Sequence, residues 1–445
     1  MKKVIAHAYV ATVDDHNTVY PDGTVVMENG LIQWVGPSKE YERNTNEHDQ
    51  QYDMRGKLVI PGLVNAHTHN VYYLMRGLGM DLELKSWLKK AIWPGLLRIG
   101  KHEAYLGSLL GNLENLRSGV TCVADNYYMP KYKKENIDGV LQAARDVGLR
   151  FLMARGFHDF AFNIPEEFVE SEDEIRQEYL RLIDVWHDPE HLFQMAISPV
   201  NILYNRLETV ANIGAIALEH GLPIHTHVAE ARFEVEEIRR RHGKTYMELF
   251  DQMGLVNTKF HAVHSVFLEE VDMKILAQNG GTAIFNPASN LLLASGVAPI
   301  EEMKKHGVHI ALGTDAPNNN QDLLESMKLA CILPRITHYN PLAMTSKEVL
   351  RMATIQGARA MGIADCVGSL EVGKRADITV VNMETLHNSP VHDPVANLVY
   401  SANQSDVVAV FIDGEPKVMD GSIVGWDVSD VIRDVGDAVR SLFPA

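Results

Sequence analysis

Eight short apolar runs, each followed by a longer amphipathic stretch, occupy the middle of the chain and constrain its fold more than any other feature. A run of this length is typical of a strand buried on both faces, and the stretch that follows has the spacing of a surface helix. Repeated strand and helix units predict a parallel sheet covered by helices. The runs are residues 58–69, 119–127, 150–159, 193–201, 222–230, 259–266, 281–290 and 308–316.

The number of these units indicates how the sheet closes. Eight strands, each followed by a helix, make a TIM barrel, so the fold class predicted is α/β with a distorted (β/α)8 barrel. A doubly wound open sheet is the structural alternative, but it would leave the polar residues at several strand ends without a common meeting point. A length of 445 residues accommodates one barrel and one smaller domain.

Both ends of the chain have a different sequence pattern, in which apolar and polar residues alternate as they do in strands. Residues 4–14 and 24–36 alternate in this way, and so do residues 376–383 and 407–419. Asn29-Gly30 and Asp413-Gly414 are typical of two-residue hairpin turns. We therefore expect a small β-sandwich domain built from residues 1–57 and 366–445, around a barrel of residues 58–365. Residues 429–442 are expected to form a helix that packs against the rest of the protein through Ile432, Val435, Val439 and Leu442, which lie at helical spacing.

The amino-acid composition indicates which classes of binding partner and which cellular compartment to expect. The chain carries 41 basic and 58 acidic residues, a formal net charge of -17, and it contains no lysine-rich run, so nucleic acid is not an expected partner. No apolar run is long enough to span a bilayer, and the first residues do not form a secretory signal, so no membrane partner is expected. Three widely spaced cysteines predict no disulfide framework, and a reducing cytoplasm is the expected location.

Histidines and acidic residues gather at the ends of four of the predicted strands. In a strand, residues i and i+2 point to the same face, so the two histidines at the end of the first run can bind one metal ion together. Nitrogen and oxygen ligands that converge from separate strands suit zinc or iron(II). The residues are His67 and His69 in the first run, His225, His227 and Glu230 in the fifth, His261 and His264 in the sixth, and Asp315 in the eighth.

Each of these motifs has an ordinary structural explanation when taken alone. A histidine pair in a buried strand can be a hydrogen-bonded core pair, and Asp315 before Ala316-Pro317 can simply cap the next helix. The joint pattern is far more specific, because independent core histidines have no reason to fall at the ends of strands one, five, six and eight. We therefore predict a metal site at the C-terminal end of the barrel.

The motifs together resemble the amidohydrolase superfamily over nearly the whole chain. The resemblance rests on PGLVNAHTH at 61–69, HTHVAE at 225–230, HAVHS at 261–265, GTDAP at 313–317 and GSLEVGKRADITVV at 368–381. Within the superfamily the chain is most similar to the mononuclear branch that contains methylthioadenosine and S-adenosylhomocysteine deaminases, guanine deaminase and triazine hydrolases. The run FQMAISPVN at 193–201 contains no lysine that could bridge two metals, in keeping with that branch.

The resemblance implies a role for individual residues. It assigns one divalent metal ion, zinc in preference to iron(II), to His67, His69, His227 and Asp315. His227 is preferred over His225 because the branch places its catalytic glutamate three positions after the ligand, where this chain has Glu230. The resemblance makes His261 the catalytic residue of the sixth strand and leaves His264 as the reserve candidate. Asp315 is expected to take part in catalysis as well as in metal binding.

These roles predict hydrolytic removal of ammonia or an amine from a small nitrogen heterocycle. Metal-activated water attacks a ring carbon, Glu230 moves protons to the ring and the leaving group, and His261 orients the water or stabilises charge. Two groups typical of the nucleoside deaminases are missing, because no acid follows Trp93-Pro94 and Val200 stands where a histidine is expected. These absences disfavour an adenosine-type substrate.

Aromatic residues after the first three runs favour a flat or hydrophobic substrate as a set, although each one alone can simply pack a loop. They are Trp87, Trp93, Tyr127, Tyr128, Phe157, Phe160 and Phe162. Two other functions stay open, namely hydrolysis that releases a different leaving group, as in triazine dechlorination or urea or amide cleavage, and a non-enzymatic scaffold. The resemblance also implies a homo-oligomer.

Overall fold

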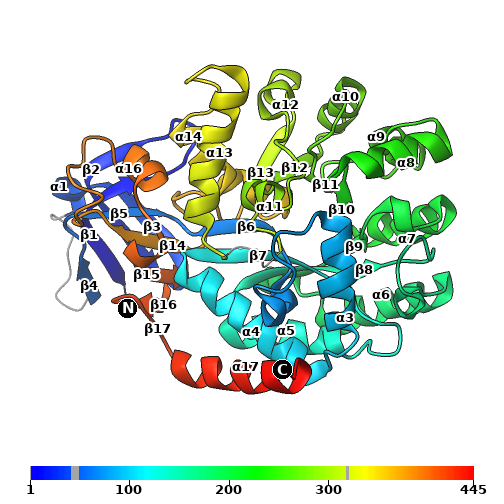
Figure 1. Cartoon of the computed structure of the whole chain (residues 1–445). Helices are drawn as coiled ribbons and strands as arrows, with labels where there is room; N and C mark the ends of the chain where they lie inside the picture. The colour runs from blue at the N-terminus through cyan, green and yellow to red at the C-terminus, as the bar shows by residue number, and fades with distance from the viewer. Residues whose placement is uncertain (1, 42–49, 317–319, 445) are drawn as a thin grey trace. The chain divides into compact units, whose positions relative to one another are not determined.

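The barrel strands lie side by side in the order of the sequence, in a computed structural model that describes residues 2–41, 50–316 and 320–444. A bridge between Thr68 and Asp315 brings the last strand beside the first, so the barrel is nearly closed (Figure 1). The predicted fold class and all eight predicted strands are confirmed. The strands are β6 (Leu63–Thr68), β7 (Val120–Tyr127), β8 (Arg150–Phe157), β9 (Phe193–Pro199), β10 (Ile224–Val228), β11 (Phe260–His264), β12 (Thr282–Phe285) and β13 (His309–Leu312).

A helix follows each barrel strand along the chain. Three of these helices, α5, α7 and α12, end at Gly148, Gly221 and Gly307, whose left-handed backbone stops the helix and starts the return to the next strand. The helices are α4 (Lys101–Arg117), α5 (Asn136–Val147), α6 (Glu172–Trp186), α7 (Leu207–His220), α8 (Arg232–His242), α9 (Tyr246–Gln252), α10 (Glu270–Gln278), α11 (Pro287–Leu292), α12 (Ile300–His306) and α13 (Leu323–His338).

The two ends of the chain form a mixed sheet of their own. Strand β5 pairs antiparallel with β14, and this pairing joins the N-terminal strands to the C-terminal ones. Side chains such as Ile5, Val25 and Phe411 form its buried core. The strands are β1 (Lys3–Ala11), β2 (Val19–Glu28), β3 (Leu31–Pro37), β4 (Gln50–Asp53), β5 (Lys57–Pro61), β14 (Ile378–Asn382), β15 (Val407–Ile412), β16 (Glu415–Met419) and β17 (Ser422–Ile423).

Both predicted hairpin turns are confirmed. Asn29 and Gly30 have φ angles of 53° and 80°, and Asp413 and Gly414 have φ angles of 51° and 69°. Positive φ at both central residues is the requirement of the hairpin turn that matches the twist of the strands. The turns join β2 to β3 and β15 to β16, so the same turn chemistry is used at each end of the chain.

The first apolar run is divided between the two sheets. Residues before Gly62 form β5 of the mixed sheet, and residues after it form β6 of the barrel. A Cβ atom added at Gly62 would lie only 2.2 Å from Oγ1 of Thr121, so no larger residue fits there without displacement. The backbone N–H of Gly62 donates to the carbonyl oxygen of Asp377 at 2.8 Å. This segment fixes where β6 starts and therefore where His67 falls on it.

The C-terminal helix, α17 (Val428–Leu442), forms as expected but buries a different stripe. Val431 and Val435 are buried, whereas Ile432 is 60% exposed, so the prediction for Ile432 was wrong. The carbonyl oxygen of Leu442 accepts a hydrogen bond from Arg98, and the Arg98 guanidinium lies over the ring of Phe443. The remaining helices are α1 (Ser38–Tyr41), α2 (Leu84–Trp87), α3 (Trp93–Leu96), α14 (Ser346–Met352), α15 (Ile355–Ala360) and α16 (Pro394–Tyr400).

The chain separates into two compact units. One contains Met1–Asn65, Leu113–Cys122 and Gln321–Val428, and the other contains Ala66–Asn112, Val123–Asn320 and Ser429–Ala445. This grouping follows the density of contacts and does not test the predicted boundaries at residues 57 and 365, which stay a prediction. All the candidate site residues discussed below belong to the second unit.

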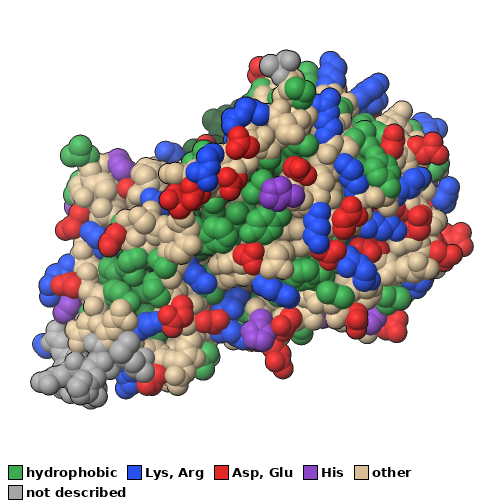
Figure 2. All heavy atoms as spheres, turned by 90° about the horizontal axis from the view of Figure 1, so that it is seen from below, with side chains coloured by type: hydrophobic (Ala, Val, Ile, Leu, Met, Phe, Trp, Pro, Cys, Tyr) green, Lys and Arg blue, Asp and Glu red, His purple; other side chains and the backbone are tan. Residues whose placement is uncertain are grey.

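Two further observations concern the charge of the surface and the apolar character of the helices. On the face shown in Figure 2, acidic and basic side chains are interspersed over the coloured part of the surface. Across residues 2–41, 50–316 and 320–444, none of the helices combines the length and the apolar character that crossing a membrane requires.

Candidate metal and catalytic site

Four buried side chains from two barrel strands and one loop converge at the C-terminal end of the barrel. His67 and His69 lie at the end of β6, His227 near the end of β10, and Asp315 three residues after β13. Each is less than 9% exposed. The structure thus brings together the four residues that the resemblance assigned to a metal.

The distances among these side chains match those expected around one small cation. His67 Nε2 lies 3.0 Å from Asp315 Oδ1, and His69 Nε2 lies 3.3 Å from the same oxygen. His227 Nε2 lies 3.4 Å from His69 Nε2. Ligands about 2.0–2.1 Å from a tetrahedral zinc ion are about 3.3–3.4 Å from one another, so the donor atoms fit such an ion without large movement.

Backbone carbonyl groups orient two of the three rings. His69 Nδ1 lies 2.6 Å from the carbonyl oxygen of Asn126, and His227 Nδ1 lies 2.7 Å from that of Val200. A carbonyl oxygen can only accept, so Nδ1 carries the hydrogen in each ring and the lone pair of Nε2 faces the cluster. Burial lowers the pKa of His67 and His227, which favours the neutral form that binds metals.

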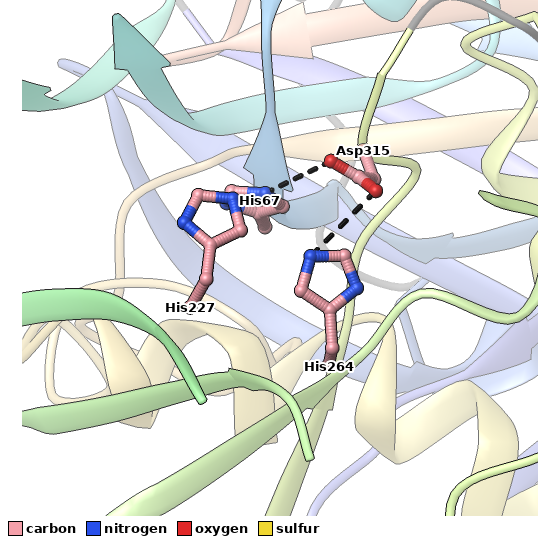
Figure 3. A group of neighbouring side chains, drawn as sticks. All are labelled: His67, His227, His264 and Asp315. Atoms are coloured by element: carbon pink, nitrogen blue, oxygen red, sulfur yellow. Dashed lines mark hydrogen bonds and ion pairs between the residues drawn. The ribbon is translucent and has the colours of Figure 1, made fainter. Parts of the chain in front are cut away.

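His264 reaches the same cluster from β11. Its Nε2 lies 3.6 Å from Glu230 Oε2 and 3.8 Å from Asp315 Oδ2. Figure 3 shows His67 and His264 approaching Asp315, with His227 beside them. One atom from each of these four residues lies within 4.8 Å of the others, so a second ligand set, with His264 in place of His69, is geometrically open.

Two residues of this region have an unusual backbone conformation. His264 and Asp315 have φ angles of 69° and 67°, a left-handed conformation that L-residues seldom adopt. Such a residue interrupts the alternation of the strand and redirects its side chain. Strained backbone at two strand ends of the same barrel supports a functional role for this region.

Glu230 lies beside the cluster and is buried. Burial, followed by the negative charges of Glu234 and Asp315, raises the pKa of Glu230 well above its usual value. A protonated carboxyl at neutral pH can donate a hydrogen bond or a proton. The direction of this shift favours the protonated form that the predicted mechanism requires.

His261 does not reach the cavity. It pairs in register with His225 on the neighbouring strand, and its Nδ1 lies 3.0 Å from Nδ1 of His225, below the cluster. The reserve candidate, His264, instead lines the cavity three residues further along. The geometry therefore does not favour the catalytic role assigned to His261, which stays an untested prediction.

An aromatic cavity opens in front of the cluster. Among the aromatic residues singled out from the sequence, Trp87, Trp93 and Tyr128 line it. Tyr127, Phe157, Phe160 and Phe162 are not in its lining; Tyr127 and Phe157 are buried, whereas Phe160 is 39% exposed. The remaining apolar wall consists of Tyr72, Leu84, Leu88, Ile164, Val200, Tyr204 and Leu293.

Three polar residues of the cavity escaped the sequence analysis, namely His158, Asn201 and Glu234. His158 and Asn201 fall at the ends of the third and fourth apolar runs. Their position at the ends of predicted strands could have identified them as candidate site residues. Glu234 lies one helical turn after Glu230, and its carboxylate accepts hydrogen bonds from the backbone N–H groups of Glu230 and Ala231. Glu234 thereby fixes the start of α8 and the segment that carries Glu230.

Comparison with known proteins places the chain in a family. A model of the amidohydrolase family matches residues 58–417. A 5'-deoxyadenosine deaminase of Methanopyrus kandleri is 33% identical over 422 residues, which cover 94% of this chain and 95% of the relative. A 5-methylthioadenosine/S-adenosylhomocysteine deaminase of Pyrococcus furiosus is 35% identical over 95% of this chain and 96% of its own. The chain therefore belongs to the amidohydrolase family.

Solved structures agree with this assignment. An adenosine deaminase from Xanthomonas campestris with bound zinc superposes with a TM-score of 0.90 at 31% identity, covering 99% of this chain and 98% of that one. The atrazine chlorohydrolase of Arthrobacter aurescens, complexed with zinc, has a TM-score of 0.92 at 26% identity over 98% and 100% of the two chains. The chain is a hydrolase of the deaminase type with a histidine and aspartate group suited to a metal.

Proposed function

We propose that the chain is a zinc-dependent aminohydrolase that removes ammonia or an amine from a flat nitrogen heterocycle. One observation carries the proposal: the Nε2 atoms of three histidines converge with Asp315 beside the buried Glu230, whose pKa is raised, at the inner end of an aromatic cavity. The deaminase names of the relatives support the same reaction class.

The proposed metal ligands are His67, His69, His227 and Asp315. Neutral imidazole and carboxylate ligands suit zinc, with iron(II) as the alternative. His69 is preferred over His264 because its Nε2 is 3.3 Å from Asp315 Oδ1, whereas His264 Nε2 is 3.8 Å from the other carboxylate oxygen. A divalent cation in this position lowers the pKa of a water from ~15.7 towards ~7, which supplies a nucleophile at neutral pH.

Glu230 is the proposed proton carrier. Its protonated carboxyl donates to the ring nitrogen next to the carbon under attack, which makes that carbon more electron-poor. The carboxylate left behind then accepts a proton from the nucleophile and delivers it to the leaving amine. The raised pKa favours both transfers, because the group holds its proton before the reaction and recovers it easily.

His264 and Asp315 complete the site. The side-chain amide of Asn290 donates to His264 Nδ1 at 3.0 Å, so Nε2–H of the neutral ring points towards Glu230 and Asp315. Burial lowers the pKa of His264 to about 3, so this ring donates a hydrogen bond without carrying a charge. We propose that it orients the nucleophile and stabilises the charge that develops, while Asp315 accepts the other proton of the water, which then returns to Glu230 and restores its protonated form.

The cavity supports a planar, weakly polar substrate. Val200 lies in the wall at the position expected to hold a histidine, and the tryptophans Trp87 and Trp93 offer faces for stacking. The relatives are named for adenosine derivatives, so an adenine-like ring is within the proposed class, but the sugar is not a required part of it.

A substrate panel tests the function. Zinc-loaded protein is incubated with aminopurines, aminopterins, aminopyrimidines, aminotriazines and 5'-modified adenosines, and ammonia release is measured. We expect turnover of free or apolar-substituted heterocycles. Turnover of nucleosides alone would contradict the proposed substrate class, and a zinc-bound protein inactive on the whole panel would support a non-enzymatic scaffold.

Release of a different leaving group is the second candidate. The similarity to the atrazine chlorohydrolase, with a TM-score of 0.92, favours it, because the same activated water can displace chloride. Chlorinated and aminated forms of one triazine, followed by chloride and ammonia assays, separate the two reactions.

We also propose that the chain forms a homo-oligomer. Helix α13 and the turn after it expose several large apolar side chains, and an exposed apolar patch is typical of an interface. They are Ile332, Ile336, Tyr339 and Leu342. Light scattering at micromolar concentration measures the assembly, and a monomer under these conditions would contradict the proposal.

A cytoplasmic location is proposed as well. Its support is chemical: the three cysteines, Cys122, Cys331 and Cys366, are all free thiols. Free thiols persist in a reducing compartment. Cell fractionation with an antibody against the chain tests the location.

A further inference from the structure

Three buried imidazole rings form a continuous line from the metal cluster into the barrel. His67 Nδ1 lies 2.8 Å from His225 Nε2, and His225 Nδ1 lies 3.0 Å from His261 Nδ1. All three rings are at most 1% exposed. The functional roles described above use His67 but neither His225 nor His261.

The line singles out His67 among the three histidine ligands. Carbonyl oxygens face the Nδ1 atoms of His69 and His227, and a carbonyl can only accept a hydrogen bond. The Nδ1 atom of His67 faces an imidazole nitrogen, which can donate or accept. His225 alone therefore leaves open which nitrogen of His67 carries the hydrogen, and the wrong choice would place it on the nitrogen that faces the metal.

Two hydrogen arrangements satisfy both contacts of the line: one puts the hydrogen of His67 on Nε2, where it can donate to Asp315 Oδ1 at 3.0 Å, and the other leaves Nε2 free for a metal. If His67 Nε2 binds a metal, Nδ1 carries the hydrogen and donates to His225 Nε2. The hydrogen of His225 then lies on Nδ1 and is donated to His261 Nδ1, so that the hydrogen of His261 lies on Nε2. Each contact has one donor and one acceptor, as buried polar groups require.

We propose that His225 and His261 are positioning residues that hold His67 in the tautomer whose Nε2 binds the metal. This inference rests on the ligand set proposed above. Polar groups behind a ligand commonly set its orientation and affinity, and their loss typically costs 10–100-fold in metal binding. A role in packing alone would need only the ring volume and not the acceptor at His261 Nδ1.

A matched pair of substitutions separates these roles. In His261→Asn the side-chain oxygen can occupy the place of Nδ1 and accept from His225, whereas His261→Leu has similar branching and no acceptor. Zinc dissociation constants are measured on metal-depleted protein by competition with a chromophoric chelator, together with the melting temperature of each metal-free variant. We expect zinc binding 10–100-fold weaker for the leucine variant and within about threefold of wild type for the asparagine variant.

A second measurement does not depend on the stability of the variants. Nitrogen-15 NMR of histidine-labelled, zinc-loaded wild type reports which nitrogen of each ring carries hydrogen. We expect Nδ1–H for His67 and His225 and Nε2–H for His261. Any other pattern on these three rings would overturn the inference.

The outcomes also distinguish this inference from the proposed function. Zinc binding by the leucine variant equal to that of wild type would overturn the positioning role and leave the proposed function intact. An asparagine variant that binds zinc normally but has lost turnover would instead give His261 a direct catalytic role. Wild type that binds no zinc would overturn the metal site and this inference together.

Discussion

The inner end and the wall of the cavity are built on different principles. At the inner end, His67, His69 and His227 each have Nδ1 engaged by a defined partner. Along the wall, large aromatic rings meet mainly through ring contacts, such as that between Tyr72 and Trp87 with centroids 6.3 Å apart. Hydrogen bonds set directions sharply, whereas apolar packing tolerates changes of shape. The inner end should therefore determine the reaction and the wall the substrate.

Among changes at the inner end and the wall, removal of the metal should have the largest effect on turnover. Dialysis against a chelator should abolish turnover, and one equivalent of zinc should restore it, because the nucleophile depends on the cation. Zinc at about 1,000 times its dissociation constant should also stabilise the fold by about 4 kcal/mol. Activity assays and thermal melts of the same samples check both effects. Full turnover without metal would contradict the proposal that the inner end determines the reaction.

Substitution of Glu230 should have the next largest effect. Glu230→Gln keeps the shape of the side chain but cannot carry the proton between the ring and the leaving amine, so we expect kcat to fall by about 10²–10⁴-fold. Zinc affinity should stay within a few-fold of wild type, since Glu230 is not a proposed ligand. The control is Glu236→Gln on the exposed face of α8, the helix that follows Glu230, which should leave kcat unchanged. An unchanged kcat for Glu230→Gln would contradict the proposed proton transfer.

Acid sensitivity tests the one imidazole in the wall. Burial lowers the pKa of His158 from 6.5 to about 3, so the unfolded chain takes up a proton that the native chain excludes. Stability contributed by neutral His158 is present above pH 6.5 and is lost as the pH falls towards 3. His158→Phe should therefore lose about 3 kcal/mol less stability than wild type between pH 7 and pH 4.

Urea titrations of metal-free protein at the two pH values measure this difference. Metal-free samples are required because acid also protonates the proposed ligands. Equal losses in wild type and His158→Phe would show that the ring is not held neutral by burial.

Loss of a single hydroxyl from the wall should have the smallest effect. Trp93 Nε1 donates to the Tyr128 hydroxyl at 3.2 Å. Tyr128→Phe keeps the ring and removes the acceptor, so we expect a loss of about 1 kcal/mol in unfolding free energy and a change in KM of less than about fivefold. A fall in kcat of more than tenfold would instead show that the hydroxyl takes part in the reaction. It would then contradict the view that the wall determines only the substrate.

Much of the fold was predictable because local signals were consistent. The strand and helix alternation predicted the barrel, and Asn29-Gly30 and Asp413-Gly414 predicted the turns, because each signal depends on a few neighbouring residues. Ile432 shows where this fails, since its helical spacing was correct but the face that packs against the barrel unit was not. A helix of mixed composition offers more than one apolar stripe, and packing selects one.

The site divides in a similar way. The sequence by itself determined that His67, His69, His227, Glu230 and Asp315 would meet, because the ends of parallel barrel strands share one rim. Only the tertiary structure separates His261 from His264, because His264 lines the cavity and His261 does not, while the catalytic role of either residue stays a prediction. Strand alternation cannot indicate where a strand stops, and the left-handed backbone at His264 is what turns that ring into the cavity while His261 stays in the barrel interior beside His225. Contacts between residues distant in the sequence impose such a conformation, so the local sequence pattern does not predict it.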